Sequence, residues 1–165
     1  RGGGGARIPD GGETMTRSGP EPRFFVRALS EKDLDQVPRV WMEAGLPYRP
    51  NGRDAPEGLR AQLRRDPDLF LGAFDGPKMV GVAIATDDGR KGWINRLAVL
   101  PSHRRLGVGE AIVKACEDAL RRRGRGVFSI LIEGENEASE TLFLKAGYRS
   151  EHDIKYYAKR DSEET

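Results

Sequence analysis

Short apolar runs and longer amphipathic stretches alternate along this chain. Six of the runs have the length and the β-branched or aromatic content that is typical of strands. They cover residues 23–27, 69–74, 79–86, 92–100, 127–132 and 154–158. The fifth run is apolar almost throughout, which indicates a strand buried on both faces and parallel to its neighbour.

Four stretches carry apolar residues at helical spacing. The first begins after Ser30, which has N-cap character, and contains Pro38 as an expected distortion. The second covers residues 57–65, and the third, the longest, runs over 108–123 and ends before Gly124. The last begins at Asn136, another candidate N-cap. The predicted order is therefore β-α-α-β-β-β-α-β-α-β.

The ends of the chain differ from this pattern. Residues 1–22 are rich in glycine and proline and have no apolar period, so we expect a disordered extension. Met15 is a candidate start of the native chain. We expect one domain over residues 23–160 and a polar tail over 161–165.

Composition narrows the class of protein. The chain has 165 residues, a net charge of +2 and one cysteine, Cys116. One domain with a proper core fits this length, and a lone cysteine allows no internal disulfide and suggests no metal cluster. No apolar run approaches the roughly 20 residues of a membrane span. The basic residues of 121–125 lack interleaved aromatic residues, so we expect a cytoplasmic protein that binds neither membrane nor nucleic acid.

A glycine-rich loop, Arg104-Arg105-Leu106-Gly107-Val108-Gly109, joins the fourth apolar run to the longest helix. Such a loop directs several backbone N–H groups at one point, and the helix adds its positive end, so the loop suits a pyrophosphate. It lacks the Gly-Lys-Ser/Thr of a Walker loop. It also lacks the third glycine of a dinucleotide-binding loop, because Ile112 stands there.

The residues around this loop resemble a known family. Leu97-Ala98-Val99-Leu100-Pro101, followed by Arg104-x-x-Gly107-x-Gly109, is similar to the acetyl-CoA loop of the GNAT acetyltransferases. Asn136 and Ala146-Gly147-Tyr148 agree with further positions of that family. The resemblance covers about residues 23–159. It implies a single α/β (α+β) domain of three layers, with a central mixed sheet of about six strands flanked by helices.

The resemblance also implies where acetyl-CoA lies as acetyl donor. The strands 93–99 and 127–132 would splay apart and hold it in the gap. Backbone groups of 97–99 would bind the pantetheine arm, and the Leu97 N–H would polarise the acetyl carbonyl. The loop would hold the pyrophosphate. The residues expected to contact the cofactor are Leu97, Ala98, Val99, Arg104, Arg105, Leu106, Gly107, Val108, Gly109, Glu110, Asn136, Ser139 and Phe143.

The catalytic groups depart from the family pattern. Phe143 stands where the family often has a tyrosine that protonates the leaving thiolate. Water or another group would serve as the acid, or the thiolate would leave unassisted. Family members with a glutamate base place it where this chain has Trp93 or Leu131. Glu133, with Glu135 nearby, is our first candidate for a general base, although a solvated loop explains both glutamates equally well.

Asn95 and Arg96 are adjacent polar residues on a strand that should be central. Alternation would send them to opposite faces, and unpaired buried polar groups are costly. Either one face opens on an acceptor cleft, or both side chains are satisfied inside the protein. On the first reading Asn95 joins Glu133 and the Leu97 N–H in the candidate catalytic set.

These observations predict an N-acetyltransferase that moves acetyl from acetyl-CoA to a primary amine by direct attack. The acidic residues between 133 and 140 suggest a small cationic amine, a lysine side chain or a peptide N-terminus as acceptor. The alternative is an acyl-CoA-binding sensor or interaction module without turnover. The resemblance leaves a homodimer open, because family members often dimerise.

Overall fold

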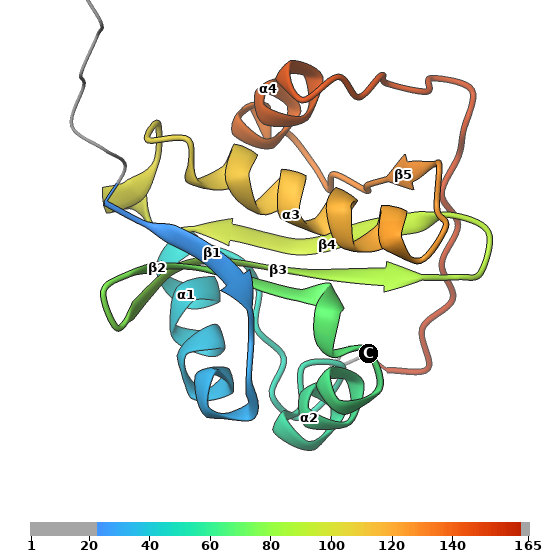
Figure 1. Cartoon of the computed structure of the whole chain (residues 1–165). Coiled ribbons are helices and arrows are strands. Elements are labelled where there is room, and N and C mark those ends of the chain that lie inside the picture. The colour runs from blue at the N-terminus through green and yellow to red at the C-terminus, as the bar shows by residue number, and fades with distance from the viewer. Residues whose placement is uncertain (1–22, 163–165) are drawn as a thin grey trace, which may run out of the picture.

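The computed structural model describes residues 23–162 and shows one mixed sheet with helices on both faces (Figure 1). The sheet has the order β1-β2-β3-β4-β5, with antiparallel pairs from β1 to β4 and a parallel β4–β5 pair. Its strands are β1 (Phe25–Ala28), β2 (Phe70–Asp75), β3 (Lys78–Asp87), β4 (Gly92–Val99) and β5 (Phe128–Ser129). The extension expected over 1–22 and the end of the expected tail, 163–165, lie outside the described residues.

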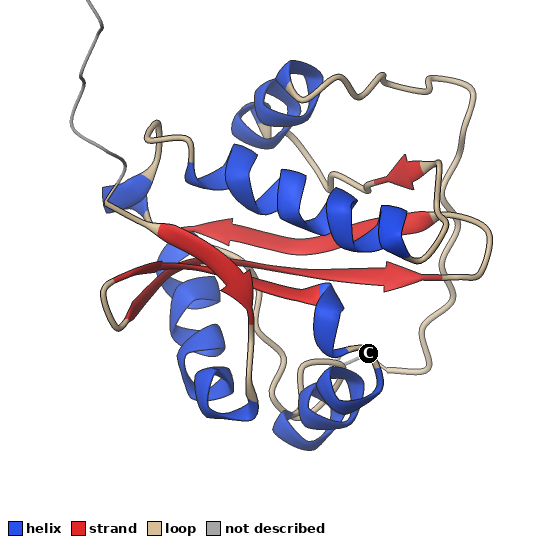
Figure 2. Ribbon diagram, in the orientation of Figure 1, coloured by secondary structure: helices blue, strands red, loops and turns tan. Residues whose placement is uncertain are grey.

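Four α-helices and three short 3₁₀ helices connect these strands. The helices are α1 (Val37–Ala44), α2 (Pro56–Arg65), α3 (Val108–Arg122), α4 (Glu137–Lys145), η1 (Glu31–Gln36), η2 (Pro67–Leu69) and η3 (Pro101–His103). Figure 2 shows α3 on one face of the sheet and α1 and α2 on the other. This confirms the predicted three-layer α/β domain.

The predicted helix after Ser30 forms in two parts. Asp33 accepts hydrogen bonds from the Ser30 backbone and hydroxyl, so the two residues make a capping box. The 3₁₀ segment then changes to α-helix at Val37, with Pro38 in the first turn. A proline is tolerated there because its missing N–H would have no partner in the helix.

The core lies on both faces of the sheet, and α3 covers one of them. Phe70, Ile112 and Leu120 are fully buried. Gly92 allows this close approach, because a Cβ there would lie 2.4 Å from Leu120 Cδ1. Gly81 does the same further along, where a Cβ would lie 2.8 Å from Ile112 Cδ1. The helix that follows the glycine loop is thus seated firmly on β3 and β4.

The C-terminal part differs from the prediction. The sheet has five strands rather than about six, because residues 154–158 form no strand in the structure. Tyr157 is 84% exposed there, and Ile154 is 70% exposed. The strand predicted over 127–132 is reduced to Phe128–Ser129. Both segments have the composition of strands, but a strand forms only where a partner offers its hydrogen bonds.

Candidate functional site

The sheet opens between β4 and β5. The two strands pair only at Gly92↔Phe128 and Trp93↔Ser129, yet β4 continues to Val99. Beyond Trp93, β4 has no strand on this side within residues 23–162. Figure 1 shows β5 and the following chain leaving the sheet toward α4. The splay that the sequence predicted is therefore present, and Leu97, Ala98 and Val99 lie on its β4 side.

A bulge in β4 lies at the same place. Ile84 pairs with Asn95, but Val82 pairs with Ala98, so β4 advances three residues while β3 advances two. Arg96, inside the bulge, has a positive φ of 56°. The extra residue breaks the alternation of side chains. Asn95 and Ala98 therefore share the face of Ile84 and Val82.

The bulge corrects the expectation that Asn95 and Arg96 point to opposite faces. The Asn95 Nδ2 donates to Thr86 Oγ1 at 3.0 Å. The Arg96 guanidinium lies over the Trp41 ring of α1, with its carbon 4.1 Å from the ring centroid. Both side chains thus lie on the face of the sheet that α1 and α2 cover, away from α3.

Arg96 fastens the loop between α1 and α2 to the bulge. Its Nη2 donates to the Pro47 carbonyl at 2.7 Å and to Asp54 Oδ2 at 3.2 Å. The same Oδ2 accepts from the Arg49 N–H at 2.9 Å. The Trp41 Nε1 in turn donates to the Arg96 carbonyl at 3.3 Å. One arginine therefore connects β4, α1 and the loop over residues 46–55.

This ion pair is mostly buried. The side chains of Arg96 and Asp54 are 17% and 5% exposed. Burial lowers the pKa of Arg96 most, and Arg53 lowers it further, while Asp54 and Glu133 act in the opposite direction. Glu133 therefore acts on the pKa of Arg96 in the same direction as Asp54. Sequence reasoning missed Asp54 and Trp41; the available clue was a lone acid in a loop that holds two arginines.

The glycine loop has the backbone of an anion site. Arg105 and Gly107 have positive φ values of 60° and 82°, and Gly107 is the N-cap residue of α3. The first bond of the helix runs from the Ala111 N–H to the Gly107 carbonyl at 3.0 Å. The N–H groups of residues 105–110 donate to no other atom of the described chain. They are free to bind an anion at the positive end of α3.

Two charged side chains of the predicted cofactor set have partners within the protein. Arg104 donates to the carbonyls of Val99 and Ala44, at 3.3 and 3.1 Å. Glu110 accepts from Lys145 Nζ of α4 at 2.6 Å. Arg105 and Leu106 are exposed. The loop is thus tied down on both sides, and its backbone faces solvent.

The residues predicted from α4 lie at its start and on its buried side. The Asn136 side chain accepts from the Ser139 N–H at 3.1 Å, which confirms it as an N-cap. Phe143 is buried, and its ring meets the Tyr148 ring edge-on at 5.1 Å. The Tyr148 hydroxyl donates to Glu117 Oε1 of α3 at 3.1 Å. Glu133 and Glu135 lie in the exposed loop between β5 and α4.

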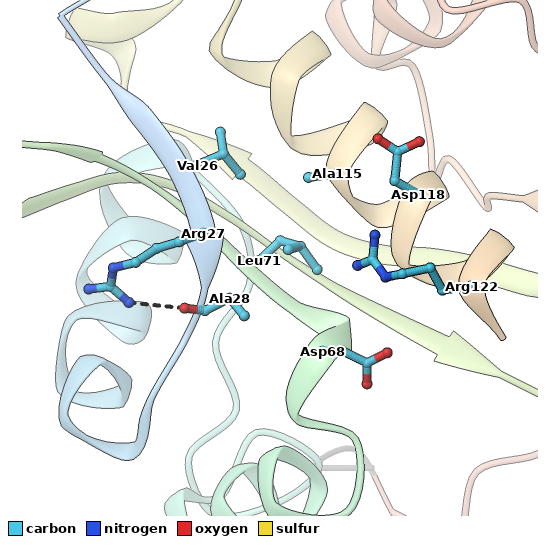
Figure 3. Close-up of a pocket in the computed structure, with 8 residues that line it drawn as sticks. All are labelled: Val26, Arg27, Ala28, Asp68, Leu71, Ala115, Asp118 and Arg122. Atoms are coloured by element: carbon cyan, nitrogen blue, oxygen red, sulfur yellow. Dashed lines mark hydrogen bonds between the residues drawn. The ribbon is translucent and has the colours of Figure 1, made fainter.

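A hollow of about 270 Å³ lies at the other edge of the sheet (Figure 3). Residues of β1, β2, η2 and α3 line it, and Figure 3 shows Arg122 and Leu71 at its wall. None of the predicted site residues borders it. The hollow is therefore separate from the gap between β4 and β5.

Comparison with known proteins decides which family this arrangement represents. The model of the acetyltransferase (GNAT) family matches residues 26–148. This chain belongs to the GNAT family. The protein is thus an acyltransferase whose acetyl donor is acetyl-CoA, as the glycine loop indicated.

Curated relatives agree with this family. Acetyltransferase SG1711 of Sodalis glossinidius (strain morsitans) is 28% identical over 135 residues, which are 82% of this chain and 94% of that protein. Acetyltransferase YPTB2753 of Yersinia pseudotuberculosis is 28% identical over 129 residues, covering 78% of this chain and 90% of its own. The chain thus spans nearly the whole length of these relatives.

Solved structures share the fold. The PaiA N-acetyltransferase of Thermoplasma acidophilum, in complex with coenzyme A, has a TM-score of 0.70 at 20% identity, over 79% of this chain and 92% of its own. AAC(6')-Iy, in complex with a bisubstrate analogue, has a TM-score of 0.69 at 18% identity, over 83% and 98%. No helix within residues 23–162 is long and apolar enough to cross a membrane.

Proposed function

We propose that this enzyme transfers acetyl from acetyl-CoA to a primary amine by direct attack. The amine nitrogen attacks the thioester carbonyl carbon, and the carbonyl oxygen gains charge. The C–S bond then breaks, the amide forms, and coenzyme A leaves as thiolate while the nitrogen loses a proton. The gap between β4 and β5, next to free backbone donors, is the observation that carries this proposal.

The glycine loop would hold the pyrophosphate. Six consecutive N–H groups over residues 105–110 have no other partner in the described chain, and α3 contributes its positive end. The exposed Arg105 adds a mobile positive charge beside them. Arg104 would act indirectly, because its side chain holds Val99 to Ala44 at the base of the loop.

The Leu97 N–H is our candidate for the donor that polarises the acetyl carbonyl. Leu97 follows the strained Arg96 in the bulge, where β4 has no β5 partner. A fixed N–H that faces the developing oxyanion is commonly the largest single contribution to catalysis. Ala98 and Val99 would bind the pantetheine arm from the same strand, which holds the thioester in register with the amine.

Proton transfer would involve the loop between β5 and α4. Glu133 is the candidate general base, directly or through water, because it is exposed and near Arg96. Asn95 would help to shape the acceptor side rather than accept a proton, since its amide is bonded to Thr86. Phe143 offers no proton, so the thiolate would leave without a protein acid.

Calorimetric titration with acetyl-CoA, alongside free coenzyme A, tests the site. We expect saturable binding at micromolar concentration for the parent protein and none for Gly107→Glu, whose carboxylate would repel the phosphates. Gly89→Glu is the matched control: both glycines have φ near +80° and open space around the missing Cβ. Unchanged binding by Gly107→Glu would contradict the loop assignment.

The second candidate function is an acyl-CoA-binding module without turnover. Phe143, buried against Tyr148 where an acid is common in the family, favours it. Release of the coenzyme A thiol in the presence of primary amines separates the two. Amine-dependent release supports the enzyme, and binding without any release supports the module.

A further inference from the structure

Arg96 is held beside the gap with part of its guanidinium uncommitted. Its Nη2 binds Pro47 and Asp54, but Nη1 has no hydrogen-bond partner among the residues that the structure describes. The Nε atom, also without a partner, is buried. An arginine presents five N–H donors in a fixed fork that matches a carboxylate. This one is already oriented by the Trp41 ring beneath it.

Positive charge exceeds negative charge around this fork. The loop over residues 46–55 supplies Arg49 and Arg53, and Asp54 is its only acid. The exposed Arg53 is close enough to lower the pKa of Arg96, as one cation does to another. Asp54 forms its ion pair with Arg96, and its Oδ2 also accepts from the backbone N–H of Arg49. One carboxylate cannot balance the charges of three guanidinium groups.

The loop after β5 contributes negative charge to the surroundings of Arg96. Glu133, in the loop after β5, is near enough to Arg96 to raise its pKa. It is exposed and has no ion-pair partner in the described chain. Guanidinium groups from β4 and from the loop over 46–55, together with carboxylates from the loop after β5, complement a molecule that carries a carboxylate and an ammonium group.

We propose that the acceptor carries a carboxylate close to its reacting amine, as a free α-amino acid does, and that Arg96 binds this carboxylate with help from Arg53. The inference rests on the proposed transfer and narrows its acceptor class. The ammonium group lies toward Glu133, which takes its proton before attack. The bulge places Arg96 next to Leu97, so the bound amine stands beside the polarised thioester.

Matched acceptors provide the test. Leucine, phenylalanine, lysine and glutamate are each compared with their amides and with the decarboxylated amines, by thiol release from acetyl-CoA. We expect the free acids to be preferred about tenfold or more in kcat/KM, as loss of a charge-assisted pair implies. The α-amine of an amino-acid amide is less basic than that of the free acid and is more often unprotonated. Intrinsic reactivity alone would therefore favour the amides over the free acids.

Substitutions of Arg96 and Arg53 test whether these residues cause the preference for free amino acids. Arg96→Met keeps the packing on Trp41 and removes the fork; we expect the KM for the amino acid to rise about tenfold while the KM for acetyl-CoA stays within about twofold. Arg122→Gln, an exposed arginine at the distant hollow, is the matched control and should change neither value. If Arg96→Met does not fold, the exposed Arg53→Gln decides, with an expected loss of about threefold in preference.

The outcomes separate this inference from the function beneath it. Amides or decarboxylated amines used as well as the acids would overturn the carboxylate assignment and leave the transfer standing. A preference retained in full by Arg96→Met and Arg53→Gln would overturn the role of these residues. Absence of transfer to every compound, with acetyl-CoA bound, would overturn the transfer and this inference with it.

Discussion

The region from β1 to α3 is packed more tightly than the region after it. Within the described chain, Phe143 is the only buried apolar side chain that follows Leu120. The earlier region holds the rest of the core, including Trp41, Phe70 and Ile112. The candidate site lies at the boundary between them. A rigid wall thus carries the backbone donors, and a loosely packed wall carries the candidate base.

This difference suits the two halves of the reaction. The cofactor end needs donors held within a fraction of an ångström, and β4 with α3 provides a firm base for them. The acceptor end meets molecules of varied shape, and loops adapt to such molecules more easily than strands do. The difference in packing therefore fits a fixed geometry where the acetyl donor binds and an adaptable one where the acceptor binds.

Truncating one large apolar side chain in each region would test the packing contrast most strongly. Phe70→Ala should lower the free energy of unfolding by about 3–5 kcal/mol, because Phe70 is fully buried between the sheet and its helices. Leu144→Ala removes a side chain that is 58% exposed, so we expect a change within about 0.5 kcal/mol. Denaturant unfolding measures both. Equal losses would show that the C-terminal part is packed as tightly as the core.

Acid should loosen the start of the rigid region. Asp33 accepts two hydrogen bonds from Arg27, at 2.8 and 2.9 Å, and two more from Ser30. The Arg27 bonds hold the pKa of Asp33 well below its usual range. Its folded pKa lies below its unfolded one, so the stabilisation is complete above about pH 4 and is lost as the pH falls further.

Asp33→Asn should therefore cost about 1–2 kcal/mol of unfolding free energy at pH 7. Its difference from the parent protein should narrow between pH 4 and pH 3, measured by urea unfolding. Asp35→Asn, an exposed acid on the same 3₁₀ segment, is the control and should leave the profile unchanged. A pH-independent difference would contradict the role of the Asp33 charge.

A smaller effect should come from the hydrogen bond that joins Tyr148, three residues after α4, to α3. Tyr148→Phe removes the hydroxyl that donates to Glu117, and we expect a loss of about 1 kcal/mol in unfolding free energy. Glu117 keeps Arg121 as a partner at 2.8 Å, which limits the loss. Tyr157→Phe is the matched control, since Tyr157 is 84% exposed. A loss equal to that of Phe70→Ala would make α4 part of the rigid region.

The fold could be predicted where local pattern and packing agree. The hydrophobic patterns over 69–100 and 108–122 correctly predicted three strands and one helix. Each of these elements packs along one whole face, so its sequence shows the pattern clearly. The strand predicted over 154–158 was wrong, although its composition is that of a strand. The composition of a segment indicates only that its side chains suit a strand. The strand forms only if a neighbouring strand pairs with its backbone hydrogen-bonding groups.

The site could be predicted in its backbone but not in its side chains. The glycine loop and the Asn136 cap follow from local rules about turns and helix ends. Asn95 and Arg96 were assigned to opposite faces, because a bulge is fixed by pairing with β3 and leaves no mark in the sequence of β4. Asp54 belongs to the Arg96 contact through the loop over 46–55, which has no period to interpret.

The extra residue in β4 also limits which insertions and deletions this protein can tolerate. Deleting one residue between Asn95 and Ala98 would leave both on the face of Val82 and Ile84, but it would remove the positive-φ step that places Arg96 beside them. A gain or loss of one codon in the nearby loop over 46–55 would shift no strand. Over evolutionary time, the loop can vary in length while the bulge is inherited as a unit.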